Sequence, residues 1–216
     1  MDAGEGAVES VAVSVSRRGD IFGGVFHGAR VLITGHTGFK GAWLCEWLLS
    51  LGAAVTGYAL EPESDSALFS QLGHARQIRH IVGDVRDGDS VQRVMAVARP
   101  DFVFHLAAQS LVRRSYREPN LTWQTNVAGT TNVLEALRHL TDPCSVVIVT
   151  SDKCYENLEC NAAFRETDPL GGHDTYSSSK AAAELAVASW RRSFFPSGHP
   201  VRIATARAGN VIGGGD

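Results

Sequence analysis

Short apolar runs alternate with longer segments of helical periodicity from Arg30 to the end of the chain. Each run is followed by glycine or polar residues, a pattern typical of strands that are buried on both faces of a parallel sheet. The runs predict strands at 31–34, 54–58, 78–83, 102–106, 146–150 and 201–206. The segments between them predict helices at 43–51, 66–73, 90–98 and 176–195, a long helix that begins at Pro119, and a polar loop at 155–174.

This alternation predicts an α/β fold, a doubly wound parallel sheet of the Rossmann type with helices on both faces in three αβα layers. We expect one domain at 29–216, and we interpret residues 1–28, which lack apolar periodicity, as a loosely ordered N-terminal extension. Ligands of such sheets bind at the carboxyl ends of the strands, near the switch in strand order. The polar motifs of this chain follow the predicted strands and therefore fall at that edge.

A glycine-rich loop, residues 34–41, joins the first strand to the first helix with the spacing G-x-x-G-x-x-G. Glycine permits a tight turn, close approach of backbone to a pyrophosphate, and close packing of helix on strand. The helix N-terminus then directs partial positive charge at the phosphates. The loop therefore predicts a dinucleotide site rather than a plain turn, and its expected contact residues are Gly35, Thr37, Gly38, Phe39 and Gly41.

The second and third strands end in carboxylates that suit the adenosine half of a dinucleotide. Glu61 lies at the usual distance for an acid that binds the adenosine ribose, although a solvated loop glutamate fits equally well. No arginine or lysine lies between Gly52 and His74 to meet a 2′-phosphate, so we expect NAD rather than NADP. Asp84 and Val85 could meet the adenine edge with a carboxylate and a backbone amide, and the alternative for Asp84 is a helix N-cap.

The fourth strand and the long helix after it supply further expected contacts. Leu106, Ala107 and Ala108 end the strand, and small side chains there allow close approach of the cofactor. Asn126 lies in the long helix, where it could fix water or backbone near the site. Each of these residues could also be purely structural.

Tyr176 and Lys180 are four residues apart on the last predicted helix and therefore share one face. A phenol has a pKa near 10, too high for a base at neutral pH, but a nearby ammonium and a positive nicotinamide ring would lower that pKa. Ser151, at the tip of the fifth strand, could share a hydrogen bond with Tyr176 and a sugar hydroxyl. The trio resembles the catalytic set of extended short-chain dehydrogenases.

Asp152 and Lys153 follow that serine, and in this the chain resembles the sugar-nucleotide 4,6-dehydratases, many of which have Asp-Glu there. The CDP-glucose 4,6-dehydratases are similar in carrying Ser-Asp-Lys followed by Cys-Tyr. The resemblance extends to Gly-His-Thr-Gly-Phe-Lys-Gly at 35–41, His-Leu-Ala-Ala-Gln at 105–109 and Arg-Ala-Gly-Asn-Val-Ile-Gly-Gly-Gly-Asp at 207–216. It covers nearly everything from residue 30 onward.

The resemblance implies a cytoplasmic lyase that converts CDP-glucose to CDP-4-keto-6-deoxyglucose by transient oxidation at C4, elimination of water and return of hydride to C6. It implies catalytic roles for Ser151, Asp152, Lys153, Tyr176 and Lys180. It also implies substrate contacts from Gln109, Ser151 and Asn210, and a homodimer formed through helices 117–139 and 176–195. A smaller C-terminal substrate domain is expected after residue 216. The alternatives are an NAD-dependent epimerase or oxidoreductase, and an inactive dinucleotide-binding fragment.

Composition excludes several other classes. The net charge of −3 and the absence of clustered basic residues argue against a nucleic-acid partner. No apolar run is long enough to cross a membrane. The four cysteines fit neither a zinc pattern nor a disulfide framework, so we expect no metal.

Overall fold

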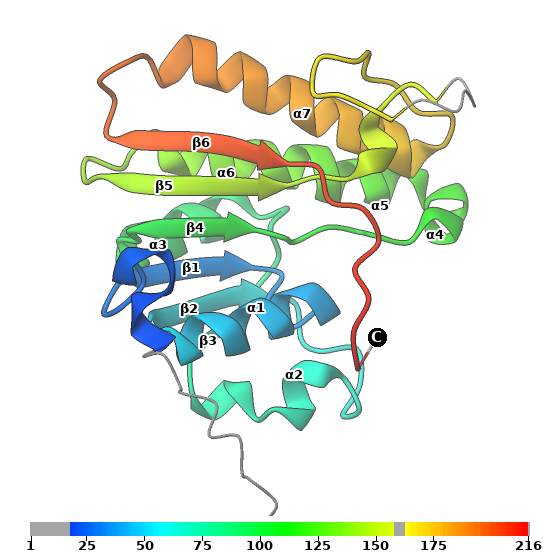
Figure 1. Cartoon of the computed structure of the whole chain (residues 1–216). Helices are drawn as coiled ribbons and strands as arrows, with labels where there is room; N and C mark the ends of the chain where they lie inside the picture. Colours follow the sequence, from blue (N-terminus) through cyan, green and yellow to red (C-terminus); the bar gives the residue numbers. More distant parts are fainter. Residues whose placement is uncertain (1–17, 158–162, 216) are drawn as a thin grey trace, which may run out of the picture.

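Six parallel strands form a single sheet in the computed structural model, which describes residues 18–157 and 163–215 (Figure 1). The strand order is β3-β2-β1-β4-β5-β6, so the direction of winding reverses between β1 and β4. The strands are β1 (Arg30–Thr34), β2 (Ala54–Ala59), β3 (Arg79–Val82), β4 (Phe102–His105), β5 (Cys144–Val149) and β6 (Val201–Ala206). All six expected strands are confirmed, and the polar residues after β1 and β4 lie at the switch point.

The helices depart from the expected ones in the middle of the chain. They are α1 (Phe39–Ser50), α2 (Leu68–Gln71), α3 (Gly88–Ala98), α4 (Val112–Arg117), α5 (Pro119–Trp123), α6 (Gly129–Leu137) and α7 (Thr175–Phe194). The long helix expected from Pro119 contains a π-helical turn, η3 (Gln124–Ala128), and α4 was not expected at all. The helix expected at 66–73 is only the short α2, followed by the 3₁₀ turn η2 (His74–Arg76).

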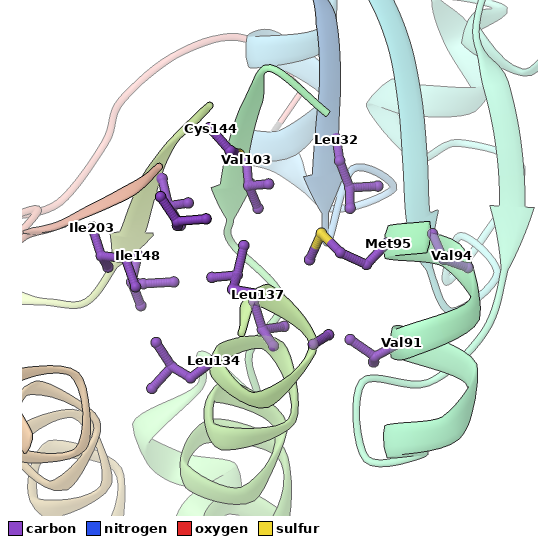
Figure 2. Packing of buried hydrophobic residues seen from close by; sticks show 14 of the residues in the cluster. Leu32, Val91, Val94, Met95, Val103, Leu134, Leu137, Cys144, Ile148 and Ile203 are labelled. Carbon is purple, nitrogen blue, oxygen red and sulfur yellow. The ribbon is translucent and has the colours of Figure 1, made fainter. Parts of the chain in front are cut away.

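One face of the sheet packs against α3, α6 and α7, and this packing forms the larger hydrophobic core (Figure 2). Leu32, Val103 and Ile148 extend from three neighbouring strands toward this layer. Met95 of α3 and Leu137 of α6 meet them, and both side chains are almost completely buried. Burial of such side chains contributes roughly 1.5 to 3 kcal/mol each, which fixes the strands whose carboxyl ends carry the site.

The opposite face is covered by α1 and α2 over β1 and β2. Val31 and Ile33 alternate with Leu32 along β1 and pack into this second core. On this face β5 and β6 leave Ser145 and Arg202 exposed, so among the described residues no helix covers the outer end of the sheet. Among the described residues, the second helical layer therefore covers only the part of this face formed by β1 and β2.

The N-terminal segment before β1 also packs on this face. It contains the 3₁₀ turn η1 (Arg18–Gly24), which precedes Phe26. The Phe26 ring lies 4.8 Å from that of Phe102, and the Phe22 ring lies 5.5 Å from that of Trp47, both measured between centroids. Packed structure therefore begins before residue 29, the first residue of the expected domain. Residues 1–17 lie outside the described residues.

Candidate active site

In the glycine-rich loop, packing leaves no room for a side chain at Gly35 and Gly41, whereas Gly38 could accept one. Gly35 has a φ of +77°, and a Cβ on it would lie 2.6 Å from the backbone nitrogen of Ala107. A Cβ on Gly41 would lie 2.2 Å from the carbonyl oxygen of Gly35. At Gly38 the nearest such atom is 3.5 Å away, which is ordinary contact. The close approach of the β1 and β4 ends therefore depends on Gly35, and the seating of α1 on the loop depends on Gly41.

The start of α1 is suited to an anion. Gly38 is the N-cap of this 12-residue helix and supplies no side-chain hydrogen bond to the free backbone N–H groups. Those groups carry the positive end of the helix dipole, so a phosphate at this position would be stabilised. The Thr37 hydroxyl donates to the carbonyl oxygen of Leu60 over 2.9 Å, which ties the loop to the end of β2. The structure thus brings the predicted loop residues together with the segment that carries Glu61.

Glu61 is exposed and lies at a cavity of about 570 Å³ beside the edge strand β3. Arg76 and His80 line the same cavity. The sequence argument for NAD considered basic residues only up to His74, and it therefore missed Arg76, which is brought here by the turn η2. A cation does lie near the expected ribose site, although Glu61 itself still disfavours a 2′-phosphate.

Asp84 forms an ion pair with Arg86, which lies two residues later in the chain. The hydrogen bond from Arg86 lowers the pKa of Asp84, so its carboxylate is firmly charged. The alternative role of Asp84 as a helix N-cap is wrong, because Asp87 caps α3 by accepting from the Ser90 amide over 3.0 Å. Val85 is buried in the larger core.

Asn126 lies in the π-helical turn, is almost completely buried, and fixes backbone near the site, one of the roles expected for it. Its Oδ1 accepts from the amide of Gln109 over 2.8 Å, and its Nδ2 donates to the Gln109 carbonyl oxygen over 3.0 Å. Nδ2 also donates to Ser179 Oγ over 2.9 Å. Asn126 therefore joins the segment after β4 to the helix that carries Tyr176 and Lys180.

The side chain of Gln109 is engaged with the protein itself. Its Nε2 donates to the Thr122 hydroxyl over 2.9 Å, and its Oε1 accepts from the Leu111 amide over 2.7 Å. In this arrangement its amide does not face an open site, so the expected contact with substrate requires the side chain to turn. Leu106 is held to β1 by a hydrogen bond from its amide to the Thr34 carbonyl oxygen. Ala108 is partly buried beside it.

Ser151 and Tyr176 converge, as the sequence predicts. Ser151 lies just after β5 and Tyr176 in the first turn of α7, and both side chains are nearly buried. Burial raises the pKa of Tyr176, and a hydrogen bond with Ser151 acts in the opposite direction. Ser151 Oγ also accepts from the Lys153 amide over 3.2 Å and lies 3.1 Å from Asp152 Oδ1. The expectation that Tyr176 has a lowered pKa is wrong for the chain by itself, because burial outweighs the hydrogen bond.

Lys180 is buried behind this pair, with 7% of its surface exposed. Its Nζ donates to the Val149 carbonyl oxygen over 3.4 Å. Burial, with the nearby charge of Lys40 as the second cause, lowers the pKa of Lys180 to about 8. The lysine can therefore change its protonation state close to neutral pH, so it is suited to exchange a proton with neighbouring hydroxyls.

Asp152 and Lys153 form an ion pair 3.6 Å long, with side chains 49% and 42% exposed. Asp152 lies beside Gly209, since a Cβ built there would be 3.7 Å from Asp152 Oδ2. Asn210 follows and is exposed. The pair thus borders the open side of the site, where a leaving hydroxyl could meet a carboxyl group.

Sequence reasoning missed a buried carboxylate behind the site. Glu184 lies one turn after Lys180 on α7 and is 5% exposed. It binds Thr150, Thr205 and Arg207. The one signal in the sequence was a charged residue in an alanine-rich apolar stretch, which alone does not separate a buried acid from a surface one.

Comparison with known proteins identifies the relatives of the chain. Residues 32–199 match the protein family described as GDP-mannose 4,6 dehydratase. The chain belongs to this family. It is 47% identical over 195 residues to the CDP-glucose 4,6-dehydratase of Salmonella typhimurium, covering 88% of this chain and 54% of that protein. It therefore spans about half the length of the curated relatives it matches.

Solved structures of relatives share the fold. A UDP-glucose 4-epimerase of Thermus thermophilus in complex with NAD has a TM-score of 0.71 at 27% identity, over 82% of this chain and 54% of that one. A dTDP-glucose 4,6-dehydratase of Streptomyces venezuelae with NAD bound has a TM-score of 0.70 at 25% identity, over 82% of this chain and 55% of that one. Within the described residues, no helix is long and apolar enough to cross a membrane, and no His, Cys, Asp and Glu side chains cluster as for a metal ion.

Proposed function

We propose that this chain carries the NAD-binding and catalytic part of a sugar-nucleotide 4,6-dehydratase that acts on CDP-glucose. The observation that carries the proposal is the convergence of Ser151 and Tyr176 with Asp152 directly beside them. A dehydrogenase or an epimerase needs the first two groups, but elimination of water also needs an acid at the sugar. The 47% identity to a CDP-glucose 4,6-dehydratase supports this choice of substrate.

The glycine-rich loop fits NAD on the evidence of its own packing. Gly38 begins a helix whose N-terminus has no capping side chain, and a side chain there would meet only ordinary contacts. Ala107, whose side chain is small, lies with its backbone against Gly35 of the same loop. The pyrophosphate of NAD would be held by the loop residues Gly35, Thr37, Gly38, Phe39 and Gly41. Glu61 would hold the adenosine ribose, and Asp84 with Val85 the adenine. The nicotinamide half of NAD would be bordered by Leu106, Ala107, Ala108 and Asn126. NAD, when bound, supplies the hydride acceptor for C4 and returns that hydride to C6.

The chain's own residues supply the proton transfers. Tyr176, beside Ser151, would accept the proton of the C4 hydroxyl, and Lys180 would hold the nicotinamide ribose and exchange protons. The resulting 4-ketone acidifies the C5–H bond. Asp152, oriented by Lys153, would donate a proton to the departing C6 hydroxyl, which leaves as one molecule of water. The C5 proton would pass to a basic group of the site, and C5 would regain a proton when hydride reaches C6. Gln109 and Asn210 are proposed to contact the sugar nucleotide.

The proposed assembly is a homodimer formed through 117–139 and 176–195. Apolar side chains on those helices support it, since Trp123 is 42% exposed and Leu185 is 61% exposed. Exposed large apolar groups on helix faces are typical of protein interfaces.

A mass measurement tests the proposed reaction. The chain is incubated with NAD and, separately, with the glucose esters of CDP, dTDP, GDP and UDP. We expect a product lighter by one water, formed fastest from CDP-glucose. An isomer of unchanged mass would support an epimerase, and NAD binding without conversion of any sugar would support an inactive dinucleotide-binding fragment.

A further inference from the structure

Glu184 is a buried carboxylate whose bonds reach both strands beside the site. Its Oε1 accepts from the Thr150 hydroxyl over 2.5 Å. Its Oε2 accepts from the Thr205 hydroxyl over 3.0 Å and from Arg207 Nη2 over 3.1 Å. An ionised carboxylate in the interior is costly unless it is paired and hydrogen-bonded, and here both oxygens are satisfied.

These partners lie where the site is assembled. Thr150 follows β5 and directly precedes Ser151, while Thr205 lies near the end of β6. Glu184 itself lies one helical turn beyond Lys180 on α7. One carboxylate therefore connects the tip of β5, the end of β6 and the catalytic helix.

Arg207 extends the network to the loop after β5. Its guanidinium lies 4.8 Å from the centre of the Tyr155 ring, which stacks on Phe164 at 4.6 Å. Its Nη1 donates to the Glu166 carbonyl oxygen over 3.0 Å. The polar loop is thus bound to the same carboxylate as the strand tips.

We propose that Glu184 is a positioning residue, which fixes Ser151 against Tyr176 by binding Thr150 and at the same time anchors α7 to β6. This inference rests on the proposed function, because it assigns Glu184 a task in that same site. Glu184 touches no reacting group itself. It acts through Thr150, and the two threonines divide its roles: Thr150 transmits position to Ser151, and Thr205 contributes only to anchoring.

The threonine pair makes a matched test. Thr150→Val and Thr205→Val each remove one hydroxyl that binds the same carboxylate, and the shape of the side chain is retained. The readout is the midpoint of the Tyr176 phenol in an absorbance titration of the chain without nucleotide or sugar. The chain has four tyrosines, so the spectrum of a matching Tyr176→Phe variant is subtracted in each background to isolate one phenol.

The groups that face Tyr176 determine the expected direction. Ser151 lowers its pKa by hydrogen bonding, and the charges of Asp152, Asp174 and Cys154 oppose ionisation of the phenol. Loss of one neutral hydrogen bond corresponds to a shift of roughly 0.5 to 1 pH unit. Thr150→Val should therefore raise the midpoint by about that amount, whereas Thr205→Val should leave it unchanged, although both lower the melting temperature.

Glu184→Gln provides a second measurement if a valine variant does not fold. Glutamine retains the shape, and its neutral oxygen accepts a weaker hydrogen bond from Thr150 than the carboxylate does, so we expect an upward shift in the same direction as that of Thr150→Val. Equal midpoints in the original chain, Thr150→Val and Glu184→Gln would overturn the positioning role, as would equal shifts in both threonine variants. Because the titration needs no turnover, failure of the dehydratase assay with these shifts intact would count against the proposed function alone.

Discussion

The side-chain amide of Asn126 donates to Ser179 Oγ over 2.9 Å, and so joins the π-helical turn after β4 to the middle of the Tyr176–Lys180 segment. The same side chain also accepts a hydrogen bond from the backbone amide of Gln109 and donates one to the Gln109 carbonyl oxygen. A regular α-helix through Gln124–Ala128 would turn this side chain elsewhere, and π turns are frequent at functional sites. The helix irregularity therefore positions the catalytic helix against the end of β4.

Replacement of Asn126 by alanine should leave the Gln109 amide and carbonyl without partners in the interior. We expect the free energy of unfolding to fall by about 2 to 3 kcal/mol. Urea denaturation measures this, with Asn120→Ala, at an exposed position on α5, as the control. A loss no larger than that of the control would show that the Asn126 bonds do not stabilise the chain.

The buried ammonium of Lys180 predicts a particular dependence of stability on pH. Its pKa is about 8 in the folded chain and about 10.5 when unfolded, so between these values only the unfolded chain carries the proton. The cost of burying the charge is complete below pH 8 and is relieved as the pH rises toward 10.5. Stability should gain on the order of 3 kcal/mol relative to a Lys180→Met variant across this window.

The control for this prediction is Lys153→Met, because that side chain is 42% exposed. Chemical denaturation at pH 7.5 and pH 10 compares the three proteins. The original chain and the control should gain stability relative to Lys180→Met. Parallel behaviour of all three would mean that Lys180 titrates normally.

The glycines of the loop should respond differently to alanine. Gly41→Ala places a methyl group against the Gly35 carbonyl oxygen and should lower the free energy of unfolding by about 3 kcal/mol or more. Gly38→Ala meets only ordinary contacts, so stability should change by less than about 1 kcal/mol while affinity for NAD falls. Thermal melts and NAD titration separate the two effects. Equal loss of stability in both variants would contradict the packing argument.

The N-terminal segment should contribute to stability through Phe26. Its ring packs on Phe102 and Phe104, so Phe26→Ala should lower the free energy of unfolding by about 1 to 3 kcal/mol. Phe22→Ala, at a ring 55% exposed, should have a smaller effect. Comparison of the two by urea denaturation checks this. The reverse order would show that Phe26 is not the anchor of the segment.

The strands and the glycine-rich loop could be predicted because their signals are local. The apolar run Val31, Leu32 and Ile33 is typical of a strand that is buried on both faces. Gly35 follows it, at a position where the turn accepts only glycine. The meeting of Ser151 and Tyr176 followed from topology, since strand ends share one edge of a parallel sheet.

Other features depend on tertiary contacts between distant segments, which the local sequence pattern does not indicate. The π-helical turn at Asn126 is specified by partners in two distant segments, so periodicity alone read it as a continuous helix. The raised pKa of Tyr176 reflects how deeply α7 is buried, a tertiary property. Arg76 and Glu184 likewise acquire their surroundings only when the chain folds.

A labelled substrate tests most directly whether Ser151, Asp152 and Tyr176 serve one sugar. CDP-glucose carrying deuterium at C4 is incubated with the chain and NAD, and the product is examined by mass spectrometry and NMR. The account predicts a 4-keto-6-deoxy product that has lost one water and carries the deuterium at C6. Deuterium retained at C4 in a product of unchanged mass, or no conversion by a chain that binds NAD, would contradict it.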